Sequence, residues 1–291
     1  MPVRDGSLTL ADGRRLAWRR YGEPGGLPIL YLHGFLGSRL EPAAAGELAA
    51  DLIVFERPGY GESDPHPAPS LLAIARDLRE GLDRLGIREF AVVGVSAGAP
   101  HALAMAHLAP ERVQAAALVG GVGDAATIRS AGGRAALLRH LDRTARAIRP
   151  GLGLARRLLL IEALGLGGLR LFSPELRRCL GSEARFREVT RRLHLSLQRS
   201  LAPGLAGVEA DLAVLAAPWG FDPAKVTVPT ALFHGRRDLI VPLGHLEFYR
   251  RTLPRVRAVE ISDDEHVSVV VNNRDRIVAA VTRAGGEPRR S

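Results

Sequence analysis

Apolar and polar positions divide this chain into short strand-like runs and longer helix-like stretches, which alternate along most of its length. Continuous apolar runs of the length of a buried strand include Ile29–Leu32, Leu52–Phe55 and Phe90–Val95. Between them lie amphipathic stretches, of which Leu71–Leu85 is followed by the helix-ending Gly86. Because buried parallel strands are apolar on both faces and are joined by helices, this alternation predicts a parallel sheet covered on both faces.

The start and the end of the chain extend the same sheet. Ser7–Leu10 and Arg14–Arg20 are predicted to be two strands joined by an Asp12-Gly13 turn. The chain is therefore expected to have an α/β fold, a mostly parallel sheet with helices on both faces. Further strands are expected at 113–119, 230–233 and 256–261, and further helices at 41–50, 97–109, 243–253 and 267–282.

The alternation stops near Gly123 and resumes near Thr230, and the region between them shows no strand pattern. Because strands and helices alternate again afterwards, we expect a helical cap inserted into one sheet domain. Residues 1–123 and 226–291 then form the core domain, and residues 124–225 form the cap; a separate helical domain is the alternative. Two helical stripes are expected there, one of Leu137, Leu138, Leu141, Ala145 and Ile148 and one of Val189, Leu193, Leu197 and Leu201.

The composition is that of a globular protein with a basic balance. The chain has 291 residues, of which 46% are hydrophobic and 24% charged, enough to bury a substantial core. The net charge is +9, but the arginines are spread through the predicted helices and Lys225 is the only lysine, so no nucleic-acid partner is expected. Cys179 is the only cysteine, which predicts a reducing compartment, the cytoplasm. Charged residues interrupt the most apolar stretch, 152–172, so no membrane span is expected.

Gly94-Val-Ser-Ala-Gly98 lies where an apolar strand runs into a helix. A serine on such a turn adopts strained backbone angles, and the two glycines remove side chains that would clash with the adjoining elements. The Ser96 hydroxyl would then lie at the edge of the sheet, beside the positive end of the helix. Ser96 is therefore the candidate nucleophile, provided that a base, an acid and an oxyanion site lie nearby.

A base and an acid for Ser96 are expected at the ends of other strands. His266 follows the last predicted strand, so a parallel sheet places it at the same edge as Ser96, and it is the candidate base. The orienting acid has two candidates, Asp238 and Asp124, each of which follows a strand; Asp238 is preferred. Residues 263–265, which are acidic, are expected to form a solvated turn.

An oxyanion site needs two backbone N–H groups aimed at one point. The N–H of Ala97, directly after the serine, and the N–H of Phe35, in the loop that follows a central strand, are the candidates. Arg57 and Ser63 lie in a Pro-Gly turn and are expected to serve that turn through local hydrogen bonds rather than to take part in catalysis.

These motifs together resemble the α/β-hydrolase superfamily, and in particular its cap-bearing esterase and lipase-like branch, over residues 7–282. The resemblance implies an eight-stranded sheet with its second strand antiparallel, and a lid over the catalytic edge. It implies that Ser96 is the nucleophile, His266 the base and Asp238 the acid. It rests on His33-Gly34-Phe35, Arg57–Ser63, Gly94–Gly98, His234–Pro242 and His266.

Three details narrow the branch. The serine at the elbow differs from the aspartate of haloalkane dehalogenases and epoxide hydrolases in this superfamily. The sequence His33-Gly34-Phe35 differs from the HGGG pattern of the hormone-sensitive lipase group. Glu265 stands where many relatives have a glycine before the late histidine, which leaves the path of that loop open.

The candidate triad and the resemblance together lead us to expect hydrolysis of small or medium apolar carboxylic esters through an acyl-enzyme, with no metal or organic cofactor. The same triad acting on amides, thioesters or carbon–carbon bonds, or in cofactor-free perhydrolysis, is the alternative within enzymes. A hydrolase-fold protein that only binds a small ligand is the alternative outside them.

Overall fold

The computed structural model describes residues 2–46, 50–130 and 173–282. Within these residues eight strands form one sheet, in the order β1-β2-β4-β3-β5-β6-β7-β8. β2 pairs antiparallel with β1 and with β4, whereas all the other neighbours are parallel, as predicted. The strands are β1 (Val3–Thr9), β2 (Arg15–Tyr21), β3 (Ile29–Leu32), β4 (Leu52–Phe55), β5 (Phe90–Val95), β6 (Val113–Val119), β7 (Thr230–Gly235) and β8 (Val256–Ser262).

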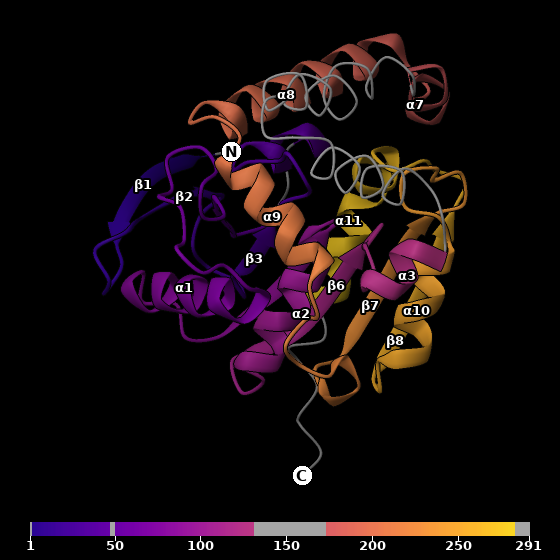
Figure 1. Ribbon diagram of the computed structural model, residues 1–291. Coiled ribbons are helices and arrows are strands. Elements are labelled where there is room, and N and C mark those ends of the chain that lie inside the picture. The colour runs from indigo at the N-terminus through magenta and orange to yellow at the C-terminus, as the bar shows by residue number, and fades with distance from the viewer. Residues whose placement is uncertain (1, 47–49, 131–172, 283–291) are drawn as a thin grey trace, which may run out of the picture.

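Helices cover both faces of the sheet (Figure 1). On one face Leu78, Leu103 and Tyr249 of α1, α2 and α10 pack into a single apolar cluster with the strands. On the other face Ile277 and Val281 of α11 pack against the opposite side of the same strands. The helices are η1 (Glu41–Ala45), α1 (Leu71–Arg84), α2 (Gly98–Leu108), α3 (Ala125–Ser130), α7 (Ser173–Leu180), α8 (Glu183–Leu201), α9 (Ala206–Ala216), η4 (Pro223–Lys225), α10 (Gly244–Thr252) and α11 (Ser268–Thr282).

The strands in the middle of the sheet differ in burial from the strand at its edge. Every residue of β3, β4 and β5 is buried, which agrees with their continuous apolar sequences. β8, at one edge, alternates between half-buried and exposed residues. The central strands are therefore shielded from water on both faces, and the loops that follow them begin in the protein interior.

Two predicted elements differ in the structure. The helix expected at 41–50 is a short 3₁₀ helix, Glu41–Ala45, which ends at Gly46 with φ +90°. Pro42 is the second residue of this short helix. The helix stops at Gly46, whose positive φ carries no steric cost for a glycine. The first strand is longer than expected and covers Val3–Thr9.

Helices α7, α8 and α9 lie between β6 and β7 in the chain, in the region predicted to form the cap. α8 carries the second predicted stripe: Val189 is buried, and Leu193 and Leu197 pack against neighbouring apolar clusters. The stripe at 137–148 and the apolar stretch 152–172 lie outside the described residues. In the part of the chain that is described, no helix has both the length and the apolar character needed to cross a membrane.

α8 is attached to the loop that follows β3. The Ser196 hydroxyl accepts a hydrogen bond from the Ser38 N–H at 3.0 Å, and the Ser200 hydroxyl donates to the Leu36 carbonyl at 2.9 Å. Both serine side chains are buried, so these bonds are shielded from water. The predicted cap region thereby rests directly on the loop that carries Phe35.

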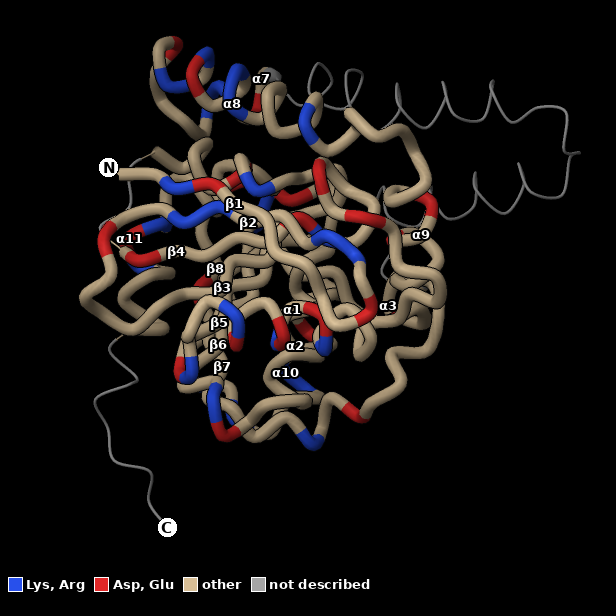
Figure 2. Tube along the Cα trace, turned by 90° about the vertical axis from the view of Figure 1, so that its left-hand side faces the viewer, with Lys and Arg blue, Asp and Glu red and all other residues tan. Residues whose placement is uncertain are grey.

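Basic and acidic positions are interleaved along the chain rather than gathered on one element (Figure 2). On α8, Arg187 pairs with Glu183 at 3.0 Å and Arg191 pairs with Glu188 at 2.9 Å. The positive charge of α8 is therefore partly balanced within the helix itself.

Candidate active site

Ser96 lies on a sharp turn between β5 and α2. Its φ is +53°, in the left-handed region that a residue with a side chain rarely adopts. The turn is fixed to β6, because the Ser96 N–H donates to the Val119 carbonyl at 2.9 Å. A β-carbon at Gly94 would lie 2.7 Å from the α-carbon of Ala99, so glycine is required for this close approach. The strained turn predicted from the sequence is present.

The structure joins Ser96, His266 and Asp238 in one chain of hydrogen bonds. The Ser96 Oγ lies 3.0 Å from His266 Nε2, and His266 Nδ1 lies 2.6 Å from Asp238 Oδ2. The three side chains come from the loops after β5, β8 and β7, which end at the same edge of the sheet. Sequence positions 170 residues apart are thus brought into contact.

Asp238 is held on both of its oxygens. While Oδ2 faces His266, Oδ1 accepts the N–H groups of Ile240 at 2.9 Å and of Val241 at 2.8 Å. His234 donates from Nε2 to the Val241 carbonyl at 2.7 Å and so closes the loop. The orientation of the Asp238 carboxylate is therefore fixed by its own loop, independently of its contact with the imidazole.

Burial opposes a positive charge on His266, but the carboxylate of Asp238 outweighs burial and raises the pKa of His266 above its ordinary value. The ring is mostly enclosed, with 12% of its side-chain surface exposed. An imidazole with this pKa readily takes up a proton from a neighbouring hydroxyl, which is the task of a general base.

Asp124, the second candidate acid, has a different role. Its Oδ1 accepts the Thr127 N–H at 2.8 Å, which caps the first turn of α3. The expectation of a solvated turn at 263–265 is wrong for Asp264 and Glu265, which are buried. Glu265 accepts the Val267 and Ser268 N–H groups and caps the start of α11, which fixes the path of the loop that carries His266.

The two candidate oxyanion donors flank the serine. Within the described residues, neither the Phe35 N–H nor the Ala97 N–H has a hydrogen-bond acceptor. Ala97 precedes the first residue of α2, where free N–H groups and the helix dipole favour negative charge. Both N–H groups therefore remain candidates for binding a substrate oxygen.

Glu41 is a site residue that the sequence did not single out. Its carboxylate accepts the Gly34 N–H, 3.0 Å from each oxygen, and the Tyr31 hydroxyl at 2.9 Å. A β-carbon at Gly34 would lie 3.4 Å from Glu41 Oε2 and 3.5 Å from the Ser96 Cβ, so the carboxylate and the serine are close neighbours. Burial raises the pKa of Glu41, although the Gly34 N–H and the Tyr31 hydroxyl oppose the increase.

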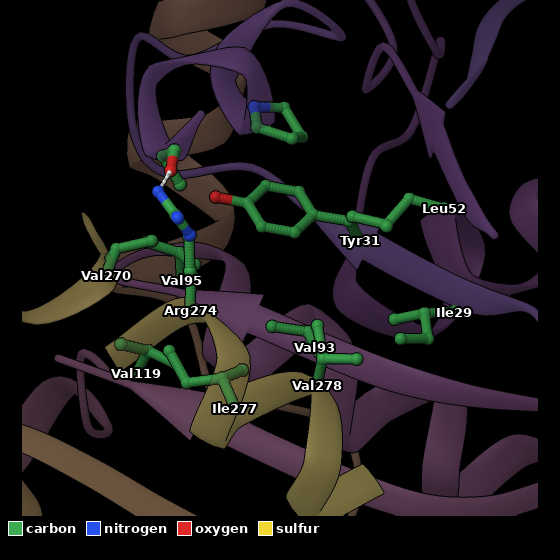
Figure 3. Close-up of a pocket in the computed structure, with 12 residues that line it drawn as sticks. Ile29, Tyr31, Leu52, Val93, Val95, Val119, Val270, Arg274, Ile277 and Val278 are labelled. Atoms are coloured by element: carbon green, nitrogen blue, oxygen red, sulfur yellow. Dashed lines mark hydrogen bonds between the residues drawn. The ribbon is translucent and has the colours of Figure 1, made fainter. Parts of the chain in front are cut away.

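A cavity of about 150 Å³ opens beside Ser96 and His266. Apart from these two residues and Glu41, most of its wall is apolar. A smaller apolar cavity of about 20 Å³ (Figure 3) shares Tyr31 with the larger one as a lining residue. The apolar residues of the larger cavity include Phe35, Val95, Leu193, Val267, Val270 and Val271.

A family described as having the alpha/beta hydrolase fold matches residues 28–272. Among curated proteins, the proline iminopeptidase of Neisseria gonorrhoeae is 29% identical over 125 residues, which are 41% of this chain and 40% of that protein. An acetyltransferase component of the acetoin cleaving system of Cupriavidus necator is 36% identical over 119 residues, 38% of this chain and 31% of that protein. The matches thus span less than half the length of these relatives.

Solved structures match over nearly the whole chain. A thermophilic esterase from Thermogutta terrifontis has a TM-score of 0.65 and 23% identity, covering 96% of this chain and 97% of that one. An esterase from Rhodococcus sp. ECU1013 has a TM-score of 0.66 and 21% identity, covering 98% and 99%. At these identities the likeness establishes the fold. With the family match over most of its length, the chain belongs to the alpha/beta hydrolase fold family.

Proposed function

We propose that this protein is a serine hydrolase that cleaves carboxylic esters through an acyl-enzyme intermediate. The observation that carries the proposal is the hydrogen-bonded chain from Ser96 through His266 to Asp238 in the wall of an apolar cavity. A serine hydroxyl is a weak nucleophile until a base removes its proton, and His266 lies within reach to do so.

In the acylation step the Ser96 Oγ attacks the ester carbonyl carbon while His266 Nε2 accepts the hydroxyl proton. Asp238 stabilises the imidazolium that forms, and the N–H groups of Phe35 and Ala97 bind the negative carbonyl oxygen. The carbon–oxygen bond to the leaving group then breaks, and His266 returns the proton to the departing alkoxide.

Deacylation repeats these steps with water. His266 removes a proton from the water as its oxygen attacks the acyl carbon, and the same two N–H groups bind the second oxyanion. The bond to Ser96 Oγ breaks, the serine recovers its proton from His266, and the acid is released. Apart from the substrate and one water molecule, these steps use only groups of the chain itself.

Residues 124–225 would act as a cap that sets substrate choice. The apolar wall, to which α8 contributes Leu193, favours small or medium acyl chains over charged ones. From the single cysteine, we further propose that the enzyme works in a reducing compartment, the cytoplasm.

Amide hydrolysis is the second candidate, because several matching curated proteins are named proline iminopeptidases. An acyl-enzyme serves amides and esters alike, so the triad does not separate them. Comparing proline p-nitroanilide with p-nitrophenyl butyrate under the same conditions does: a higher kcat/KM on the anilide would replace the esterase proposal with a peptidase.

The decisive experiment compares the protein with Ser96→Ala on p-nitrophenyl butyrate. We expect the substitution to lower kcat by about 10⁴-fold or more, because the nucleophile itself is lost. A fluorophosphonate probe should label Ser96, as located by mass spectrometry. Hydrolysis close to the original rate in Ser96→Ala contradicts the proposal, and a protein that neither hydrolyses the ester nor takes the label is better described as a ligand-binding member of the family.

A further inference from the structure

The inference concerns the peptide group between Gly34 and Phe35, and it rests on the proposed function. In a trans peptide the carbonyl and the N–H point in opposite directions. The Gly34 carbonyl and the Phe35 N–H belong to one such plane. Whichever groups hold the Gly34 oxygen therefore determine where the candidate oxyanion donor points.

Three donors hold the Gly34 oxygen. Arg57 Nη2 lies 3.1 Å from it, His33 Nδ1 lies 2.9 Å from it, and the Gly37 N–H donates to it at 3.1 Å. Arg57 Nη1 also donates to the preceding carbonyl, that of His33, at 2.5 Å. The planar fork of the guanidinium thus donates to two successive carbonyls of the loop, of which that of Gly34 points away from the Phe35 N–H.

The tautomer of His33 follows from its second nitrogen. Nε2 accepts the backbone N–H of Arg57 at 3.3 Å, so the ring proton is on Nδ1, where it is donated to Gly34. Burial lowers the pKa of His33 well below its ordinary value, and the neighbouring positive charge of Arg57 lowers it further. The lowered pKa and the two hydrogen bonds therefore all favour the neutral ring in this tautomer.

The counter-ion of Arg57 comes from α9, which belongs to the region predicted to form the cap and lies beside α2 (Figure 1). Asp211 Oδ2 lies 2.7 Å from Arg57 Nη2 and accepts the Tyr60 hydroxyl at 3.0 Å. Its other oxygen lies 3.2 Å from His101 Nε2. Arg57, Tyr60, His101 and Asp211 are all buried, so each polar group depends on the others rather than on water.

Arg57 determines the charge state of the Asp211 carboxyl. Burial opposes ionisation of Asp211, but the guanidinium outweighs burial and lowers the pKa of the carboxyl. The result is a buried ion pair that connects α9 to the loop after β3. The expectation that Arg57 serves only its local turn is therefore wrong for its side chain. Ser63 does serve the turn, through its bond to the Glu56 carbonyl at 2.7 Å.

We propose that Arg57 is a positioning residue for the oxyanion hole and that Asp211 holds it in place from α9. Together with His33 and the Gly37 N–H, the guanidinium fixes the plane of the Gly34–Phe35 peptide, and it is the only charged group of the three, so its charge on the carbonyl side polarises the N–H on the other side. Because the oxyanion is fully formed only in the transition state, Arg57 acts on the rate of the chemical step and not on substrate binding.

The test uses Arg57→Gln combined with Asp211→Asn, which removes both charges and leaves no buried ion without a partner. With p-nitrophenyl butyrate we expect kcat to fall by about 10- to 100-fold, because removal of a whole oxyanion donor costs about 10²–10³-fold and here the donor is only misaligned. KM should change by less than about threefold. The affinity of a trifluoromethyl ketone, which forms a tetrahedral adduct with an oxyanion, should fall in parallel with kcat/KM.

The matched control is Tyr60→Phe. It removes one hydrogen bond to Asp211 but touches neither carbonyl of the loop, so it should lower the melting temperature while kcat stays within about twofold. A folded double variant with unchanged kcat, or with a loss confined to KM, overturns the proposal.

If the double variant lacks the near-ultraviolet circular dichroism of the folded protein, Asp211→Asn alone carries the test. It keeps Arg57 but frees it from its counter-ion, and an unchanged kcat again overturns the proposal. Ser96→Ala, measured alongside, separates the two failures. An original protein without Ser96-dependent hydrolysis refutes the serine hydrolase itself, whereas full activity in the Arg57 variants beside an inactive Ser96→Ala refutes only the positioning role.

Discussion

At the scale of single residues, Asp238 and Asp124 show how two carboxylates that follow strands take different tasks. Asp238 has one oxygen on two backbone N–H groups and the other 2.6 Å from His266. Asp124 uses its oxygen to cap α3. The two carboxylates differ in role because different groups surround them, and substituting each one in turn tests this difference.

We expect Asp238→Asn to lower kcat by about 10³- to 10⁴-fold. The amide no longer stabilises the imidazolium and favours the wrong tautomer of His266. Asp124→Asn is the matched substitution: it should leave kcat within about threefold, since asparagine also caps helices. Steady-state kinetics on p-nitrophenyl butyrate measure both. Equal losses in the two variants would contradict the assignment of the acid.

The pH profile follows from the pKa of His266. The base works in its neutral form, so kcat/KM should rise with pH through the raised pKa of His266, and the midpoint should lie above the ordinary value of 6.5. Glu41→Gln removes a carboxylate that favours the imidazolium, so the midpoint should move to lower pH.

Tyr31→Phe is the control for this shift. It removes the hydroxyl bonded to Glu41 at 2.9 Å but keeps the carboxylate, so the midpoint should move less than in Glu41→Gln. A midpoint that stays in place in Glu41→Gln would show that the carboxylate does not act on the base.

At the scale of elements, α8 joins the predicted cap to the core and contributes to the cavity. Leu193 lines the cavity beside Ser96, whereas Leu195, two positions on, is 43% exposed. These two leucines lie on the same helix, but only Leu193 faces the cavity. Replacing each of them in turn with tryptophan therefore separates the effect of filling the cavity from the effect of changing α8 itself.

We expect Leu193→Trp to shift ester preference toward shorter acyl chains, with kcat/KM on p-nitrophenyl hexanoate falling by about tenfold or more relative to acetate, because a lost pocket contact of one or two methylenes is worth about 1–3 kcal/mol. Leu195→Trp should leave the acetate-to-hexanoate ratio within about twofold. A ratio that is unchanged in Leu193→Trp would show that the acyl chain binds elsewhere.

At the scale of the whole molecule, the net charge of +9 is distributed and partly paired. Arg14 contacts Asp77 at 2.6 Å and Arg20 contacts Asp51 at 2.6 Å, so arginines in and directly before β2, like those of α8, have acidic partners. A distributed charge attracts polyanions without recognising them.

Retention on a heparin column should therefore be weak and should end below about 0.3 M NaCl, where the screening length falls to roughly 6 Å. Chromatography at increasing salt measures this directly. Retention that persists to about 1 M NaCl would instead indicate a built anion site.

The sequence by itself determined the order of strands and helices and pointed to the three residues of the hydrogen-bonded chain. These follow from local patterns: apolar runs of strand length, a glycine-flanked serine, and polar residues placed directly after strands. The antiparallel second strand was expected from the resemblance of the chain's motifs to the α/β-hydrolase superfamily. The short η1 was not foreseen, because the effect of Pro42 and Gly46 on an otherwise helical stretch depends on what packs there.

Only the tertiary structure decided the roles of Glu41, Arg57 and Asp211. Each is an ordinary charged residue in its local sequence, and none has a spacing that distinguishes it from a solvated one. Arg57 and Asp211 are 154 positions apart and meet because α9, in the predicted cap region, packs against the core. The environment of a buried charge is set by segments distant in sequence, so the groups that hold the loop after β3 become visible only when the chain is folded.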